Sequence, residues 1–296
     1  MVTLGTFDGV HLGHRKVLER LKEIAAQTGG ETVIFTFHPH PRQVLYPGEH
    51  NLRLLNTLAE KTELLEQAGV DHLVVFPFTR AFAELSYRQF VHDILVDRLN
   101  TSCLVVGYDH KFGKDRQGDF HYLQACAEKY HFRVERLDVL LSNELEISST
   151  RIREALESGD IQKANRFLGY PYSLHGRVVE GRKVGRLIGF PTANIEADEV
   201  TKLIPGYGVY AVWANLSGTV RPGMLNIGIR PTFAQNADER SIEVHLFDFD
   251  ELIYGCNITL YFQEKLRDEL KFPDKEALIR QLHLDRQAAR NILDSL

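Results

Sequence analysis

Two hydrophobic rhythms divide the chain. From residue 1 to about residue 168, short aliphatic and β-branched runs alternate with segments of helical spacing. The runs are MVTLG at 1–5, ETVIFTF at 31–37, HLVVFPF at 72–78, SCLVVG at 102–107 and HFRVERL at 131–137. Nearly continuous apolar runs of this kind indicate strands buried on both faces of a parallel, doubly wound (Rossmann-like) α/β sheet. Ligands of such sheets bind at the carboxyl ends of the strands.

The helical segments of this half carry recognisable start signals. Apolar spacing predicts a first helix from near Leu12. Thr57 with Glu60, and Ser86 with Gln89, have the spacing of a capping box and predict two further helix starts.

The second rhythm begins near residue 173, where short strand-like runs are separated by glycine and proline turns. The runs are HGRVVEG at 175–181, GVYAVWANL at 208–216, GMLNIGI at 223–229, SIEVHLFDF at 241–249 and NITLYFQ at 257–263. They predict a small antiparallel β-barrel or sandwich. An amphipathic helix is expected over roughly 274–293. We place the domains at 1–168 and 169–296, with the junction in FLGYPYSLHG at 167–176.

Composition narrows the possible functions. A net charge of −5 argues against a general nucleic-acid binder but leaves anionic small ligands open. Cys103, Cys126 and Cys256 are too scattered for a disulfide framework or a zinc site, which suits the cytoplasm. No apolar run reaches about 18 residues, so no membrane span is expected. We therefore expect small-molecule substrates and a monomer or weak homo-oligomer.

The stretch GTFDGVHLGH at 5–14 is the first candidate site. It places His11 and His14 at a helix start that follows the first strand, where free N–H groups and the helix dipole favour an anion. Gly9 and Gly13 would permit close approach and unusual backbone angles. Two imidazoles there could stabilise charge during phosphoryl or nucleotidyl transfer. The alternative is a surface turn that contains two histidines, whereas the spacing is wrong for a metalloprotease zinc pair.

Two later stretches extend this candidate site. In ISSTRIREAL at 147–156, Ser149 is a natural N-cap, Thr150 opens a helix, and Arg151 and Arg153 follow in the first turns, a set that suits a triphosphate. In VGYDHKFGKDRQGD at 106–119, Asp109 follows a strand and could contact a ribose or a metal. A capped surface helix and a solvated loop are the respective alternatives.

Taken together, these motifs resemble those of bacterial bifunctional riboflavin kinase/FAD synthetases. The resemblance includes TFHPHP at 36–41 and continues through GRLIGFPTANI, LNIGIRPTF and EKLRDELKF, so it covers essentially the whole chain. It implies that the first half is an H-x-G-H nucleotidyltransferase that transfers AMP from ATP to FMN, yielding FAD and pyrophosphate. His11 and His14 would contact the ATP phosphates. The other nucleotide- or flavin-binding residues implied for this half are Gly5, Phe7, Asp8, Asp109, Ser149, Thr150, Arg151 and Arg153.

For the second half the resemblance implies a riboflavin kinase with a six-stranded antiparallel barrel. Thr192 and Asn194 of PTAN would bind Mg²⁺ and ATP through their oxygens, which suit magnesium. Glu243 would be the catalytic base that takes the proton of the ribityl 5′-hydroxyl. Gly185 and Arg267 are the further binding residues that the resemblance implies.

Strand periodicity supports part of this assignment. Glu243 alternates with Ile242 and Val244, so its side chain should point away from the aliphatic face, into solvent or a site. A carboxylate there could deprotonate a hydroxyl. The alternative is a solvated strand residue, and the residues by themselves show no Walker A motif or kinase-type glycine loop.

Three departures from the family pattern bear on the first half. The chain starts four residues before Gly5, Thr6 stands where asparagine is frequent, and His110 replaces an aromatic residue. One competing hypothesis is therefore a riboflavin kinase alone, with adenylyl transfer weakened by the short N-terminus. Another is a nonenzymatic flavin- or nucleotide-binding module, which would not need Glu243 beside Thr192 and Asn194.

Overall fold

A computed structural model describes residues 1–46, 52–108, 110–138, 141–142, 145–181, 185–229 and 240–295. The chain divides into two compact units, Met1–Ser149 and Thr150–Leu296. Each unit is built differently, as the change of hydrophobic rhythm predicts.

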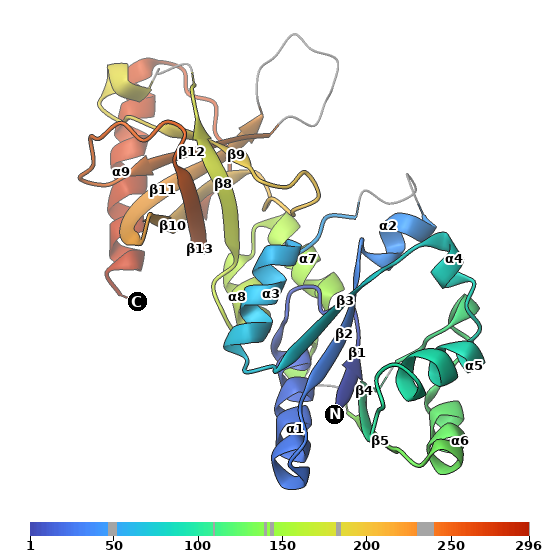
Figure 1. Cartoon of the computed structure of the whole chain (residues 1–296). Coiled ribbons are helices and arrows are strands. Elements are labelled where there is room, and N and C mark those ends of the chain that lie inside the picture. The colour runs from blue at the N-terminus through green and yellow to red at the C-terminus, as the bar shows by residue number, and fades with distance from the viewer. Residues whose placement is uncertain are drawn as a thin grey trace. The chain divides into compact units, whose positions relative to one another are not determined.

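The first unit is built on a five-stranded parallel sheet with the strand order β3-β2-β1-β4-β5 (Figure 1). Its strands are β1 (Val2–Leu4), β2 (Val33–His38), β3 (His72–Pro77), β4 (Cys103–Gly107) and β5 (Arg133–Leu137). All five predicted strands are therefore confirmed. Burial on both faces holds for the central strands but is wrong for the two edge strands, β3 and β5, whose residues are partly exposed.

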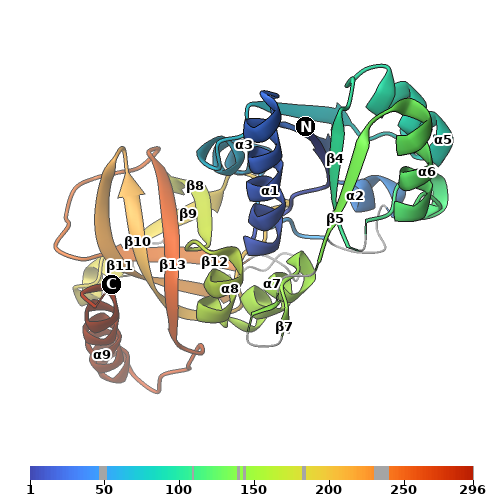
Figure 2. The ribbon, with the colours of Figure 1, turned by 90° about the horizontal axis from the view of Figure 1, so that it is seen from below.

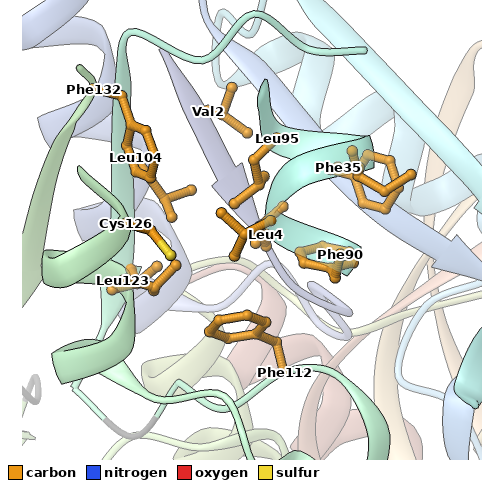
Figure 3. Packing of buried hydrophobic residues seen from close by; sticks show 13 residues of the cluster. Val2, Leu4, Phe35, Phe90, Leu95, Leu104, Phe112, Leu123, Cys126 and Phe132 are labelled. Carbon is orange, nitrogen blue, oxygen red and sulfur yellow. The ribbon is translucent and has the colours of Figure 1, made fainter. Parts of the chain in front are cut away.

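Helices cover both faces of this sheet, which confirms the doubly wound arrangement. On one face α1 packs through Leu18 and Leu21. The other face carries the cluster of Figure 3, in which Phe90 and Leu95 meet Leu4. The helical elements of this unit are α1 (Leu12–Thr28), α2 (Pro41–Leu45), α3 (Leu58–Gln67), α4 (Arg80–Ala83), α5 (Tyr87–Gln89), η1 (Phe90–Val96), η2 (Lys114–Arg116) and α6 (Phe120–Tyr130).

Both predicted capping boxes are present. Thr57 accepts from the backbone N–H of Glu60 and opens α3, and Ser86 accepts from that of Gln89 and opens α5. The continuation η1 is wound as a π-helix, which the apolar spacing alone does not distinguish from an α-helix. A two-stranded hairpin, β6 (Leu141–Ser142) with β7 (Leu145–Glu146), ends the unit.

The second unit contains a closed antiparallel barrel of six strands in the order β10-β11-β12-β9-β8-β13. The strands are β8 (Ser173–Val179), β9 (Ala193–Ala197), β10 (Gly208–Leu216), β11 (Thr219–Ile229), β12 (Arg240–Leu246) and β13 (Asn257–Arg267). The barrel alternative is confirmed over the sandwich. A short 3₁₀ turn, η3 (Gly185–Ile188), precedes β9.

Three helices accompany the barrel. The predicted terminal helix is α9 (Lys275–Leu293), capped by Asp274, and it lies along β10, β11 and β13 (Figure 2). Ahead of the barrel come α7 (Ser149–Ser158) and α8 (Ile161–Leu168). The Asn165 amide of α8 donates to the Phe262 carbonyl of β13 at 2.9 Å. The domain boundary proposed at residues 168 and 169 stays a prediction.

Candidate active sites

The first site begins with the histidine pair, which lies at the start of α1 directly after β1. His11 is the N-cap of the helix, and its Nδ1 accepts from the backbone N–H of His14 at 3.4 Å. The two imidazole rings are stacked with their centroids 3.7 Å apart. Because Nδ1 of His11 is an acceptor, a neutral His11 carries its proton on Nε2. The helix start adds the unpaired N–H groups and positive dipole end that favour a phosphate.

The turn that carries this pair has a strained backbone. Phe7, Gly9 and Val10 have φ angles of 47°, 92° and 33°. Left-handed backbone costs a non-glycine residue roughly 1–2 kcal/mol, so the surrounding structure must hold Phe7 and Val10 in place. Asp8 contributes to this, because its buried Oδ1 accepts from the backbone N–H groups of Leu55 at 2.9 Å and Asn56 at 3.2 Å.

Two glycines of the motif lie close to neighbouring side chains. A Cβ on Gly13 would lie 3.1 Å from His11 Nδ1, and a Cβ on Gly5 would lie 3.1 Å from the ring of Phe7. Gly5 and Gly13 therefore leave space that a side chain would fill, and the predicted ligand contact of Gly5 stays a prediction.

The electrostatics of His14 favour a neutral ring. Burial, followed by the neighbouring His11 and Lys61, lowers the pKa of His14 well below its usual range. Its Nδ1 is buried and has no hydrogen-bond partner among the described residues. A buried nitrogen of this kind needs a partner, which a bound ligand could supply.

Lys61 is a charged residue of this site that the sequence reasoning missed. It lies in α3, is only 7% exposed, and its Nζ donates to the Thr6 carbonyl at 2.7 Å. Burial lowers the pKa of Lys61, and the charge of Asp8 opposes that effect. A lysine between Glu60 and Glu63 on a capped helix looks like an ordinary surface charge, so no sequence signal marks its burial.

The ISSTR stretch meets the turn through Ser149, whose hydroxyl donates to the Asp8 carbonyl at 2.7 Å. Because α7 begins at Ser149 itself, the N-cap assignment is wrong by one residue. Thr150, Arg151 and Arg153 follow in α7, in the second unit, and their contact with ATP stays a prediction. Asp109 lies outside the described residues. The ring of the neighbouring His110 is stacked against that of Phe112, with the centroids 5.9 Å apart.

The second site gathers three predicted residues, one on β12, one on β9 and one directly before β9. The Thr192 hydroxyl donates to Glu243 Oε2 at 3.0 Å, and Asn194 of β9 is the register partner of Glu243 on β12. Ile242 and Val244 are buried, whereas Glu243 is partly exposed. The expectation that Glu243 points away from the aliphatic face is therefore confirmed.

Glycines again set the space around this site. A Cβ on Gly181 would come within 1.9 Å of Asn194 Nδ2, and one on Gly185 would come within 2.2 Å of the Phe190 carbonyl oxygen and 3.4 Å of Thr192 Oγ1. Gly185 is thus brought beside Thr192, as the family resemblance implies. Side-chain hydroxyl, amide and carboxylate oxygens on adjacent strands are ligands that fit Mg²⁺.

Two further residues of the barrel have structural partners. Both carboxylate oxygens of the buried Asp285 in α9 accept from Arg267, with the shortest contact 2.7 Å, so this guanidinium ties β13 to α9. The role of Arg267 in ligand binding stays a prediction.

His245 contacts the Pro191 carbonyl at 2.7 Å beside the PTAN stretch, and burial lowers the pKa of His245.

Two hollows lie on the second unit. A pocket of about 130 Å³ is lined partly by Thr192, Arg186 and Tyr254. A mostly apolar pocket of about 470 Å³ is formed by η3 and the start of α9, including Leu187, Phe272 and Leu278. The smaller pocket adjoins Thr192 and therefore belongs to the second site.

The chain thus combines an α/β unit that has a histidine pair at a helix start with a barrel unit that has Thr192, Asn194 and Glu243 together. Residues 1–151 match the FAD synthetase family and residues 168–293 match the riboflavin kinase family. The chain belongs to the family of bifunctional riboflavin kinase/FMN adenylyltransferases.

Curated relatives with that name align over nearly the whole chain. The protein of Listeria monocytogenes is 42% identical, covering 98% of this chain and 91% of the relative. The protein of Haemophilus influenzae is 41% identical, covering 99% of this chain and 94% of the relative. The protein of Bacillus subtilis is 38% identical, covering 100% of this chain and 93% of the relative.

A solved structure shares the fold. A crystal structure described as a macrolide-efflux protein from Streptococcus pneumoniae aligns with a TM-score of 0.89 at 30% identity, covering 98% of this chain and 93% of that one. In the part of this chain that the structure describes, none of the helices has the length and apolar character needed to cross a membrane.

Proposed function

We propose that this chain makes FAD from riboflavin in two steps, one in each unit. The barrel unit transfers the γ-phosphate of ATP to the 5′-hydroxyl of riboflavin, yielding FMN and ADP. The α/β unit transfers AMP from a second ATP to FMN, yielding FAD and pyrophosphate. The observation that carries the proposal is a site on each unit, the stacked His11–His14 pair at a helix start and the Thr192–Glu243–Asn194 set.

In the first unit the FMN phosphate is the nucleophile. One of its oxygens attacks the α-phosphorus of ATP, and the bond to the pyrophosphate oxygen breaks. Charge grows on the phosphate oxygens during this step, and N–H groups of His11, His14 and the start of α1 would stabilise it. No protein nucleophile is required, so catalysis consists of positioning and charge stabilisation.

In the second unit Glu243 is proposed to accept the proton of the riboflavin 5′-hydroxyl. The hydrogen bond from Thr192 fixes the orientation of this carboxylate. Oxygens of Thr192 and Asn194 would hold Mg²⁺, which when bound neutralises phosphate charge. The apolar pocket between η3 and α9 has the character needed for a flavin ring.

We propose small-molecule substrates, no nucleic-acid or membrane partner, a cytoplasmic location, and a monomer or weak homo-oligomer. Light scattering of the purified chain tests the last of these.

Chromatography of flavins over time tests the proposed function. Pure protein with riboflavin, ATP and Mg²⁺ should form FMN first and FAD later. His14→Ala should accumulate FMN, with adenylyl transfer about 10²-fold slower and kinase activity unchanged. Glu243→Gln should leave riboflavin unconverted but still form FAD from added FMN. Formation of neither product by the wild-type chain would refute the proposal.

Supplying FMN and ATP and measuring pyrophosphate tests the kinase-only alternative. The match of residues 1–151 to the FAD synthetase family favours pyrophosphate release. Absence of pyrophosphate, with FMN still formed from riboflavin, would establish the alternative instead.

A further inference from the structure

Lys61 combines three features that an ordinary structural lysine lacks. Its ammonium group is almost completely buried, it binds the backbone of the strained turn, and its charge acts on His14. Buried ammonium groups are costly unless they are paired, so a lysine at this position needs a compensating role.

The hydrogen bond of Lys61 is placed where the turn needs support. The Thr6 carbonyl that it binds lies directly before Phe7, the first residue with left-handed backbone. The same carbonyl also accepts a longer bond of 3.3 Å from the Thr36 hydroxyl of β2. Lys61 thus connects the turn to α3, and Asp8 connects it to the backbone directly ahead of α3.

Among the described residues, the charge of Lys61 interacts with Asp8 and with His14. Asp8 stabilises the ammonium form, while the ammonium group disfavours protonation of His14. The charged and titratable groups that act on His14 among the described residues are therefore His11 and Lys61. Both act in the same direction and keep its ring neutral.

We propose that Lys61 is a positioning residue of the first site, whose ammonium group holds the Thr6–Val10 turn and places a fixed positive charge behind His14. The inference rests on the proposed adenylyl transfer by the first unit. A fixed charge of this kind attracts the triphosphate before the imidazoles gain any charge of their own. It also leaves His14 neutral, with a nitrogen available to the incoming phosphate.

Three substitutions separate the hydrogen bond from the charge. Lys61→Met removes both, Lys61→Gln keeps an amide donor without the charge, and Lys61→Arg keeps both. Lys22→Met is the matched control, because the Lys22 ammonium also donates to a backbone carbonyl, that of Ala68 at 2.7 Å, but on the exposed side of α1.

Carbon-detected titration of the histidine rings in the nucleotide-free chain gives the first measurement. We expect His14 to titrate at higher pH in Lys61→Gln and Lys61→Met than in the wild type, and at the wild-type pH in Lys61→Arg and Lys22→Met. The His92 signal, from η1 of the same unit, reports whether the unit is folded. If Lys61→Met does not fold, Lys61→Gln decides by the same criterion.

Kinetics give the second measurement. Adenylyl transfer should fall about 10- to 100-fold in Lys61→Met, the range for residues that orient the groups in contact with the substrate. The loss should be smaller in Lys61→Gln, and Lys61→Arg should keep a rate near that of the wild type. Kinase activity should stay unchanged throughout. An unchanged His14 titration in folded Lys61→Gln, or wild-type adenylyl transfer in Lys61→Met, would overturn the proposal. The titration requires no turnover, so its result stands apart from any failure of the proposed function.

Discussion

Two histidines of the first unit have their pKa values moved in opposite directions. Burial lowers the pKa of His14, whereas the hydrogen bond to Asp93 and the charge of Asp97 raise the pKa of the exposed His92. At pH 6.5 we therefore expect His14 to be neutral and His92 to be mostly charged. Ring titration between pH 8 and pH 5 checks this in one experiment. Protonation of both rings over the same pH range would contradict it.

The shifted pKa of His14 also gives a direction for stability. Its folded-state pKa lies below the unfolded value of about 6.5, so the unfolded chain binds a proton first as the pH falls. The stability contributed by neutral His14 is fully present above about pH 6.5 and is lost progressively below it. Denaturant unfolding of His14→Gln and wild type at pH 7.5 and pH 5.5 measures this. The substitution should remove part of the acid sensitivity.

The hydroxyl of Thr192 offers a test of the second site. Thr192→Val keeps the side-chain shape but removes the donor to Glu243 and one oxygen proposed for Mg²⁺. We expect riboflavin phosphorylation to fall by at least about 10-fold, the scale of a lost orienting contact, with adenylyl transfer unchanged. Thr192→Ser retains the hydroxyl and should stay near the wild-type rate; equal losses in both variants would argue against a role for the hydroxyl.

At the residue scale, the sequence points to the candidate site residues but not to the residues that hold them in place. His11 and His14 are recognisable because their motif combines unusual residue types with a strand end and a helix start, whereas Thr192 and Glu243 are indicated only by the family resemblance. The buried charge of Lys61 is not, because its burial depends on where α3 packs, which no local pattern encodes. The resemblance implies only ligand binding for Asp8, whereas in the structure its carboxylate accepts hydrogen bonds from the backbone N–H groups of Leu55 and Asn56.

At the element scale, the ion pair between β13 and α9 is expected to stabilise the barrel unit. Asp285 is 3% exposed and its partner Arg267 17%, so Asp285→Ala leaves a largely buried guanidinium unpaired. We expect a loss of about 3 kcal/mol in the free energy of unfolding, measured with denaturant.

A second ion pair of α9 provides the control for this prediction. Asp248 pairs with Arg290 at 2.7 Å, but its side chain is 80% exposed. Asp248→Asn removes the charge and keeps a residue type that tolerates the left-handed backbone of position 248, so it should cost less than about 1 kcal/mol. Equal costs for the two substitutions would show that burial does not set the strength of these contacts.

The elements themselves follow closely from hydrophobic period. Strands β1 to β5 and most of the barrel strands were predicted because each is an apolar or alternating run between turns. The pattern does not identify strand β9, because the strand is short and opens with Ala193 and Asn194, two residues after Pro191. Its identity depends on pairing with β8 and β12, which is tertiary information.

At the scale of the whole molecule, helix α8 is expected to be needed for the full stability of the barrel unit. Its buried side chains are Ile161, Ala164, Phe167 and Leu168. Burying four apolar side chains contributes several kcal/mol, roughly 1.5–3 for each of the larger ones. The fragment 150–296 should therefore unfold at clearly higher denaturant concentration than the fragment 169–296, and retain more kinase activity. Equal midpoints would show that the barrel does not need α8.

The closure of the barrel has a consequence for how its site assembles. In the described ranges, β9 and β12 share two register pairs, one of which joins Asn194 to Glu243, whereas β10 and β11 share nine. The barrel should therefore open first between β9 and β12. This opening separates Asn194, the proposed metal ligand, from Glu243, the proposed base. A ligand that bridges both strands binds only the closed ring and shifts the population toward it. Mg²⁺ and ATP should accordingly slow amide hydrogen exchange along β9, so that the substrate itself completes the closed barrel in which it reacts.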